Sequence, residues 1–383
     1  MFQTARVATR LTIQAVVILE ILFWAALVGL LWTHVAYPAV IVVGARLGSR
    51  RSVEPAELPA VAVIVAAYNE ESVIERRVEN LRALDYPSDK LELVVTSDAS
   101  TDRSEELAAA AGARVIGNPR GGKVAAQDRA VRETESEIVA FSDANATWAQ
   151  DALRRLVAPF ADPAVAYVCG QLRLEAADGS NKEGAYWRYE MATRSAESRL
   201  GSVTGGNGSI YAVRRSDYVE VDPRFGHDLA LPYLMVQHGR RAVYAPDAHA
   251  FEKPTPSNET EYRRKVRMFE HCWLIVLRGK MLRGQPPGYL LALLSHRHLR
   301  YASGLLHLVL LATSIALVAD LPHTGGWIYA TALAAQVALL AAAAVGVGIA
   351  RYYVLVTWAT VVSLWNYLRR GVPTTWQPAE GTR

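Results

Sequence analysis

The sequence predicts an α/β domain with transmembrane helices at both ends of the chain. Apolar residues make up 51% of the 383 residues, and they gather toward the two ends. Between these ends the chain becomes more polar, and short strand-like apolar runs alternate with helix-like segments, which is typical of an α/β sheet. A chain of this length has room for such a domain and for membrane helices.

The first apolar segment, Leu11–Val43, has Glu20 as its one formally charged residue. It can span a bilayer, because a helix of about 20 apolar residues crosses the hydrocarbon core. It is also about twice as long as the apolar region of a cleaved signal peptide, so we expect it to be retained. Residues 1–52 are thus a predicted transmembrane segment and basic linker, with a helical hairpin broken near Pro38 as the alternative. The linker's basic residues favour a cytoplasmic position for the chain that follows: Arg46, Arg50 and Arg51.

The middle of the chain, residues 53–260, is the predicted α/β domain. It begins with two strand–helix units, and a further short strand follows them. The expected elements, in order, are a buried strand at Val61–Ala66, a helix at Glu71–Leu84, a strand at Leu91–Ser97, a helix at Ser104–Ala111 and a strand at Ile138–Phe141.

Short acidic and amide side chains follow three of these strands. Open α/β sheets bind ligands at the carboxyl ends of their strands, so we expect these side chains to form a site. Helix capping alone explains Asp102 and Ser72. Three coincident clusters favour a functional role for Asp98 and Asp143. Neither a G-x-G-x-x-G nor a P-loop pattern is present, which disfavours the common dinucleotide and nucleoside-triphosphate folds.

For residues 261–300 the sequence predicts two amphipathic helices at the membrane interface, Glu261–Arg283 and Gln285–Arg300. Residues 301–383 predict three more spans. Their apolar stretches carry almost no charge, whereas soluble core helices usually keep a polar stripe. One span before the domain and three after it would leave Arg369 and Arg370 outside, against the positive-inside rule, so the last stretch can instead be re-entrant or interfacial. The stretches are Leu305–Val318, Trp327–Ala350 and Tyr352–Leu368.

The formal net charge of +4 and a pI near 9.0 fit a protein that rests on anionic membrane lipid. Nucleic acid is not an expected partner, because the basic residues cluster near the membrane segments. Cys169 and Cys272 lie in the predicted cytoplasmic part, and we expect neither a disulfide nor a zinc site from them. The isolated histidines are expected to be structural: His238, His249, His296 and His298.

Seven sequence elements, taken together, resemble the family-2 glycosyltransferases, whose membrane members include cellulose, chitin and hyaluronan synthases. The resemblance covers roughly Ala60 to Trp273. It implies a GT-A fold, a Rossmann-like domain with a mixed central sheet, which binds a UDP-sugar and a divalent cation. The elements in chain order are Val63–Glu70, Ser97–Asp102, Gly121–Lys123, Phe141–Asn145, Thr204–Gly208, His227–Asp228 and Arg263–Arg267.

The resemblance also implies roles for single residues on the donor side. Tyr68, Glu70 and Asp98 would hold the uridine, because carboxylates accept hydrogen bonds from the uracil N–H and the ribose hydroxyls. Lys123 and Arg267 would face the diphosphate, which suits cationic donors. A loop on the acceptor or sugar side would consist of Thr204, Gly205, Gly206 and Asn207.

Asp143 and Asn145 occupy the family's D-x-D motif, which implies that they hold Mg²⁺ or Mn²⁺ on the diphosphate. Asn145 can ligate the cation through its amide oxygen, although it brings no negative charge. Asp228 matches the family's general base, and His227 stands where a second acid is usual. The implied reaction is a single in-line displacement that inverts the anomeric centre, with Asp228 taking the proton of the acceptor hydroxyl.

One departure concerns the acceptor. Processive synthases usually carry Q-x-x-R-W, and Met268 here stands in place of the tryptophan that stacks on the acceptor chain. Trp187 or Trp273 could replace it. The neighbouring basic residues are equally well explained by lipid headgroups or by a catalytic role: Arg263, Arg264 and Lys265.

The predicted function is therefore sugar transfer from a UDP-sugar at the cytoplasmic face of a bacterial inner membrane. Extension of a polysaccharide or glycan is one version, favoured by the number of spans, and a partner subunit could then complete a pore. Single transfer to a polyprenyl phosphate or glycolipid is the alternative, favoured by Met268. A transporter is disfavoured because polar residues are scarce in the spans. A non-catalytic scaffold is the remote alternative, disfavoured because the family's motif residues are present.

Overall fold

The computed structural model describes residues 13–47, 57–175, 184–254, 257–320 and 326–373. Eight strands form one sheet in the order β3-β2-β1-β4-β7-β6-β8-β5. β1 to β4 are mutually parallel where they pair, whereas β7 runs antiparallel to both β4 and β6, so the sheet is mixed. The strands are β1 Val61–Ala67, β2 Leu91–Asp98, β3 Arg114–Asn118, β4 Ile138–Asp143, β5 Thr147–Trp148, β6 Val165–Leu174, β7 Tyr211–Arg214 and β8 Arg241–Glu252.

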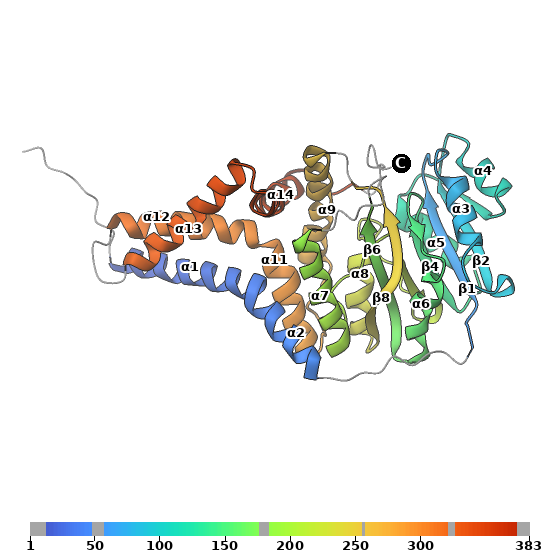
Figure 1. Ribbon diagram of the computed structural model, residues 1–383, viewed down its shortest axis with the longest axis horizontal. Coiled ribbons are helices and arrows are strands. Elements are labelled where there is room, and N and C mark those ends of the chain that lie inside the picture. The colour runs from blue at the N-terminus through green and yellow to red at the C-terminus, as the bar shows by residue number, and fades with distance from the viewer. Residues whose placement is uncertain (1–12, 48–56, 176–183, 255–256, 321–325, 374–383) are drawn as a thin grey trace, which may run out of the picture.

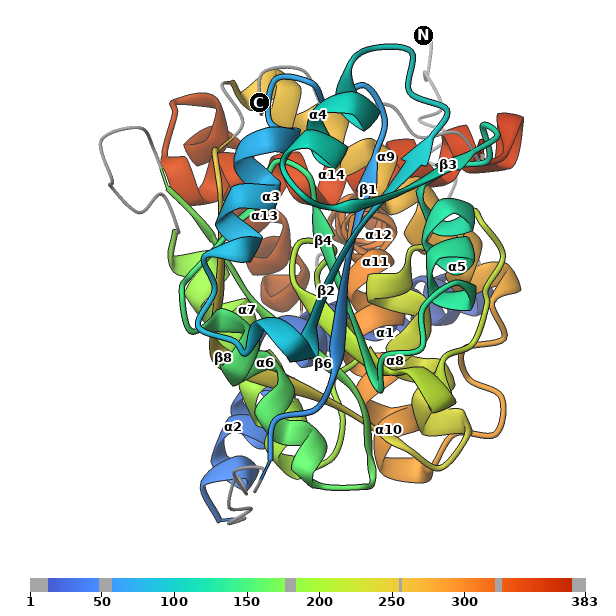
Figure 2. The same ribbon diagram turned by 90° about the vertical axis from the view of Figure 1, so that its right-hand side faces the viewer.

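Helices cover both faces of this sheet (Figures 1 and 2). Side chains of α3, α4 and α6 join the apolar core on one face. Side chains of α5, α7 and α8 join the core on the other. All seven residues of β1 are buried, as expected for a central parallel strand with two covered faces. These helices are α3 Ile74–Arg82, α4 Ser104–Ala110, α5 Lys123–Arg132, α6 Ala152–Val157, α7 Ala185–Leu200 and α8 His227–Gln237.

Short helical turns and the remaining helices complete the fold. The 3₁₀ turns are η2 Ser88–Lys90, η3 Ala158–Ala161 and η4 Arg215–Asp217, and the π-turns are η1 Trp32–Ala36 and η5 Leu293–His298. The other helices are α1 Ile13–Leu31, α2 Tyr37–Leu47, α9 Asn258–Arg278, α10 Pro287–Ala292, α11 Leu299–Tyr301, α12 Ser303–Asp320, α13 Gly326–Ala344 and α14 Gly348–Arg370.

The N-terminal apolar segment is one long helix, Gln14–Leu47, and not a hairpin. Its irregular turn, η1, precedes Pro38, which has no N–H to continue the ordinary ladder, and the Tyr37 N–H bonds to the Trp32 carbonyl instead. The helix measures roughly 50 Å at 1.5 Å per residue, longer than a bilayer core of about 30 Å. Its two halves pack differently, since α1 lies against α12 and α2 against α7.

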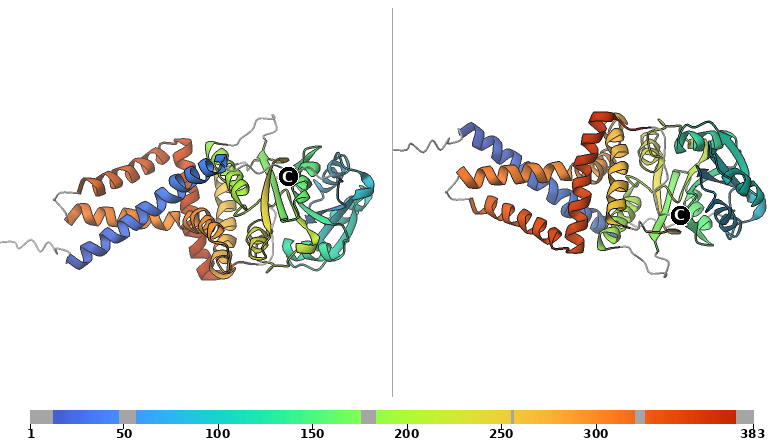
Figure 3. Two further views of the ribbon diagram at one scale, coloured as in Figure 1. Left: turned by 90° about the horizontal axis from the view of Figure 1, so that it is seen from below. Right: turned by 90° about the horizontal axis from the view of Figure 1, so that it is seen from above.

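Among the described residues, two helices are long and apolar enough to cross a membrane, Gln14–Leu47 and Gly326–Ala344. A third candidate exists if Pro287–Tyr301 and Ser303–Ala319, which meet at a bend of 64°, form one broken span. The expectation of four spans is therefore wrong for the last stretch, Tyr352–Leu368. It lies in α14, which crosses the base of the α1, α12 and α13 group beside α9 (Figure 3).

The polar side of α14 explains this position. Its Asn366 donates to Glu270 of α9 at 2.9 Å, and Arg370 pairs with the same carboxylate at 3.3 Å. The indole N–H of Trp273 donates to the Thr360 carbonyl at 2.9 Å. Because these contacts commit one side of α14 to α9, this side is not available to lipid.

Candidate active site

One large cavity, of about 1750 Å³, lies between the sheet and the helices α9 and α14. Residues near the ends of β4 and β8 line one part of it, among them Asp143, Asn145 and Glu252. His34, Ser303 and Tyr352 line another part, and these belong to the apolar helices or to α14. The cavity therefore joins the carboxyl end of the sheet to the helical base.

Carboxylates gather around one lysine in this cavity. Lys123 begins α5 and forms an ion pair with Asp143 at the end of β4. Ser209 bridges Asp143, at 3.3 Å, to Glu252 at the end of β8. Burial alone lowers the pKa of Lys123, but the negative charges of Asp143, Asp228 and Glu252 outweigh it and raise that pKa above its usual value.

Glu252 shows that negative charge is in excess here. Burial and the neighbouring Asp143 carboxylate raise the pKa of Glu252 to about 7. Carboxylates that share a confined site resist simultaneous ionisation unless a cation offsets them. Carboxylate and amide oxygens are also the ligands that Mg²⁺ and Mn²⁺ prefer. Asp143 with Asn145, both half-buried in the cavity lining, thus offers chemistry that fits a divalent cation.

A second cluster holds the glycine-flanked loop ahead of α5. Asp98 is 2% exposed and accepts the N–H groups of Gly121 at 2.7 Å and Gly122 at 3.0 Å. Arg120 binds the same carboxylate and lies over the ring of Tyr68, 3.3 Å from its centroid. Asp98 therefore fixes the position of the loop that leads into Lys123.

The predicted uridine residues Tyr68, Glu70 and Asp98 are absent from the described lining of the large cavity. Glu70 is buried, and its N–H bonds to the hydroxyl of Ser104 at 2.7 Å. Asp102 accepts the N–H of Ser104, the first residue of α4, at 3.0 Å, although the N-cap position itself is Arg103. The structure therefore places the predicted donor residues in two adjoining groups, with Lys123, Asp143 and Arg267 in the cavity.

Asp228 lies in the first turn of α8 and lines the cavity. Its backbone carbonyl accepts the N–H of Gly206 at 2.6 Å, which ties the 204–207 loop to the start of α8. A Cβ added at Gly206 would stand 2.1 Å from the Tyr167 hydroxyl, so this position has no room for a side chain. Asn207 braces the loop, since its amide donates to the Gly170 carbonyl at 2.6 Å.

His227, beside Asp228, is buried and bonds elsewhere. Its Nδ1 lies 3.0 Å from the Tyr211 hydroxyl and its Nε2 lies 3.3 Å from the Tyr218 hydroxyl. Asp128 is 3.7 Å from the same ring. The ring therefore orients the start of α8.

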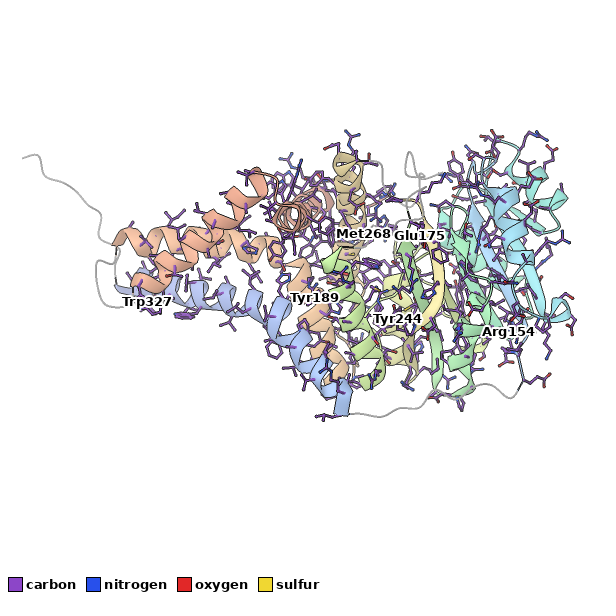
Figure 4. The ribbon with its side chains drawn as sticks, viewed as in Figure 1. Arg154, Glu175, Tyr189, Tyr244, Met268 and Trp327 are labelled. Atoms are coloured by element: carbon purple, nitrogen blue, oxygen red, sulfur yellow. The ribbon has the colours of Figure 1, made fainter. Side chains whose placement is uncertain are left out.

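Helix α9 forms the opposite wall of the cavity and carries Arg264, Arg267 and Met268. Arg267 is exposed and Arg264 is half-buried. Arg264 pairs with Glu261 at 2.9 Å, and its positive charge acts on Glu252. Met268 is 38% exposed, and Figure 4 labels it on α9 near the strands β6 and β8.

The two tryptophans that could replace the missing stacking residue differ in position. Trp187 on α7 lines the cavity, and its indole nitrogen is buried with no hydrogen-bond partner among the described residues. Trp273 is buried between α9 and α14 and does not belong to the described lining. Trp187 is thus the tryptophan available to a bound molecule.

Sequence reasoning missed Ser209, Glu252 and Arg194. Glu252 obeys the same strand-end rule as Asp143, but its strand was not anticipated. Arg194 donates to the Gly206 carbonyl at 3.1 Å from α7, and nothing in its local sequence indicates that contact.

Cys169 and Cys272 are both buried free thiols. No group of three His, Cys, Asp or Glu side chains forms a metal cage in the part of the chain described.

Comparisons with known proteins identify the family of the chain. Residues 62–221 match the family described as Glycosyl transferase family 2. An N-acetylglucosaminyltransferase of Rhizobium meliloti (strain 1021) is 30% identical over 299 residues, which cover 68% of each protein. A beta-monoglucosyldiacylglycerol synthase of Synechocystis is 34% identical over 164 residues, which cover 40% of this chain but only 33% of that relative.

A solved structure shows the same fold over nearly the whole chain. It is the mannosyltransferase PcManGT from Pyrobaculum calidifontis, in complex with GDP-Man and Mn²⁺. The two structures superpose with a TM-score of 0.71 at 24% identity, covering 92% of this chain and 99% of the other. The mixed, Rossmann-like sheet is therefore a GT-A fold. From these relatives, the chain belongs to glycosyltransferase family 2 and is a glycosyltransferase.

Proposed function

We propose that the chain transfers one glycosyl unit from a UDP-sugar to a hydroxyl oxygen of a lipid-linked acceptor, with inversion at the anomeric carbon. One observation carries this proposal: a single cavity contains Asp228, Lys123 and Asp143 and also reaches His34 and Ser303 of the apolar helices. An amphiphilic acceptor can therefore keep its tail beside these helices while its polar end lies near Asp228.

In this proposal Asp228 takes the acceptor proton while the acceptor oxygen attacks the anomeric carbon and the bond to the diphosphate breaks. Lys123, with Arg264 and Arg267 from α9, offsets the negative charge on the departing UDP. Asp143 and Asn145 would hold a divalent cation, which would supply further charge stabilisation to the diphosphate. Tyr68, Glu70 and Asp98 would bind the uridine beside the cavity.

Extension of a glycan is the second candidate function. Trp187 favours it, because this side chain in the cavity lining offers an aromatic face for a sugar ring. Met268 instead favours single transfer, because a thioether lacks the flat face of the usual tryptophan. Product length separates the two.

The membrane arrangement that we propose has α1, α12 and α13 inserted, with α9 and α14 at the cytoplasmic interface. The exposed apolar side chains of these inserted helices support it, among them Ile21 on α1, Ile315 on α12 and Trp327 on α13. Figure 4 shows Trp327 at the far end of these helices from the sheet. Protease treatment of inside-out and right-side-out bacterial vesicles tests the orientation: degradation of the catalytic domain in right-side-out vesicles would contradict it.

Purified protein in lipid, given UDP-sugars or GDP-mannose with Mg²⁺ or Mn²⁺, tests the activity. The assay measures nucleotide release and product size with and without polyprenyl phosphate or diacylglycerol lipids. We expect one UDP-sugar to be consumed, and Asp228→Asn to lose at least 100-fold in kcat, the scale of general-base catalysis. Asp89→Asn, at an exposed carboxylate outside the cavity lining, is the matched control. Full activity of Asp228→Asn would refute the assigned base.

A further inference from the structure

A buried group of charged side chains lies behind the 204–207 loop, outside the residues assigned to the reaction. Its centre is Glu197 of α7, whose side chain is 2% exposed. Glu197 contacts Nδ1 of His296 at 2.7 Å, and it accepts the N–H of Thr204 at 3.1 Å and the Thr204 hydroxyl at 3.0 Å. Thr204, the first residue of the loop, is thus bound through backbone and side chain.

Arg297 holds the same threonine from the other side. Its Nε donates to the Thr204 carbonyl at 3.1 Å and to the Thr204 hydroxyl at 3.0 Å. A Cβ added at Gly205 would stand 2.6 Å from the guanidinium, so the close approach of Arg297 requires glycine at this position. Glu197 and Arg297 together leave the start of the loop little freedom.

The far end of the loop meets the proposed base. The Gly206 N–H donates to the Asp228 carbonyl at 2.6 Å, and Arg194 donates to the Gly206 carbonyl at 3.1 Å. A shift of Thr204 would therefore reach Asp228 through two intervening residues. Arg297 and Arg194 also line the cavity that contains Asp228.

The N-terminal apolar helix supports the same group. Tyr37 donates its hydroxyl hydrogen to Glu197 at 3.0 Å. Its neighbour Thr33 donates to the Ser295 carbonyl at 2.6 Å, directly before His296 and Arg297. Tyr189 of α7 donates to the His34 carbonyl at 2.9 Å, and Figure 4 shows it where α7 meets α11. These contacts fall at the π-turn η1, so the irregular turn lies where the helix meets the catalytic domain.

We propose that Glu197 and Arg297 are positioning residues, which hold the 204–207 loop so that the acceptor lies within reach of Asp228, and that Tyr37 makes the N-terminal helix part of this device. A purely stabilising role explains the group poorly, because apolar residues usually replace buried ion pairs with little loss of stability. Such a network instead fixes the geometry of the loop that it binds. This inference rests on the proposed transfer reaction.

The test compares Tyr37→Phe, Glu197→Gln and Arg297→Lys with wild type in lipid. The readouts are the acceptor KM and the ratio of sugar transferred to acceptor over sugar lost to water, because this ratio does not depend on the fraction of active protein. We expect the ratio to fall about tenfold for Glu197→Gln and Arg297→Lys, and about threefold to fivefold for Tyr37→Phe, which loses one hydrogen bond. The acceptor KM should rise while the donor KM stays within about twofold, since Lys123 and Asp143 are untouched.

Tyr329→Phe is the matched control. It removes a hydroxyl that bonds to Glu20 on the same N-terminal helix at 2.9 Å, far from the loop, and both readouts should keep their wild-type values. If Glu197→Gln does not fold, Arg297→Lys and Tyr37→Phe still test whether this group positions the loop. An unchanged ratio and acceptor KM in those two variants would overturn the inference while leaving the transfer reaction intact. Failure of wild type to consume any donor would instead refute the proposed function.

Discussion

Replacement of Lys123 should change donor binding and metal binding in opposite directions. Without nucleotide, its ammonium pairs with Asp143, one of the two proposed metal ligands, and so occupies an oxygen that a divalent cation would need. In the proposed donor complex, the same ammonium would face the diphosphate. Hydrogen bonds to charged groups contribute about 1.5–3 kcal/mol, so Lys123→Gln should weaken donor binding roughly 10-fold to 150-fold. The same change frees Asp143 and should tighten Mn²⁺ binding to the nucleotide-free protein by about tenfold or more.

Calorimetric titrations of the protein in detergent, with Mn²⁺ alone and with UDP alone, measure both affinities without turnover. Lys123→Arg is the matched control: it keeps the positive charge, so Mn²⁺ binding should remain close to that of wild type. The reasoning is refuted if Lys123→Gln weakens Mn²⁺ binding or leaves UDP affinity unchanged. Either result would mean that Lys123 does not exchange between the carboxylate and the diphosphate.

Contacts in the structure lead to three further predictions, two of which have a matched comparison substitution. Gly206→Ala should abolish transfer, because its Cβ would stand 2.1 Å from the Tyr167 hydroxyl; Gly201→Ala, which meets nothing within 4 Å, should retain wild-type turnover in the same assay. Trp187→Ala should raise the acceptor KM, whereas Trp273→Phe should lower the melting temperature and leave that KM near wild type. Arg77→Ala should lower the free energy of unfolding by about 3 kcal/mol or more in a denaturant titration. The buried guanidinium of Arg77 bonds to the Ser142 hydroxyl at 2.7 Å and lies over the indole ring of Trp148. A loss below about 1 kcal/mol would contradict this prediction.

β1, β2 and β4 could be predicted because they are continuous apolar runs, whereas β3, which lies in the same half of the sheet, was not anticipated. β1 and β2 each extend only one residue past the expected end, and β4 ends at Asp143, two residues past it. β6, β7 and β8 were not anticipated individually. β8 contains Pro246 and Asp247 and its register with β6 is irregular, so neither an apolar run nor a strict alternation marks it. Glu252 was missed for the same reason.

The site was predictable in type but less so in arrangement. Strand-end acids and the family resemblance correctly brought Asp143, Lys123 and Asp228 into one cavity. They did not reveal that Asp98 uses its oxygens on the N–H groups of Gly121 and Gly122. That contact depends on how the loop that begins at Arg120, 22 residues further along the chain, folds back onto Asp98. Short-range sequence patterns carry no information about such a contact.

The last apolar stretch shows that freedom from charge alone does not make a helix a candidate span. Tyr352–Leu368 is as free of charge as a span, yet its polar side chains recur on the side of α14 that faces α9, and Glu270 of α9 binds both Asn366 and Arg370. Arg370 therefore stays beside the catalytic domain. In the membrane arrangement that we propose, α14 is not a span, and the conflict with the positive-inside rule does not arise. The same position places Tyr352 and Thr357 in the lining of the cavity. A segment whose composition suggests a membrane helix therefore forms part of the wall of the candidate active site.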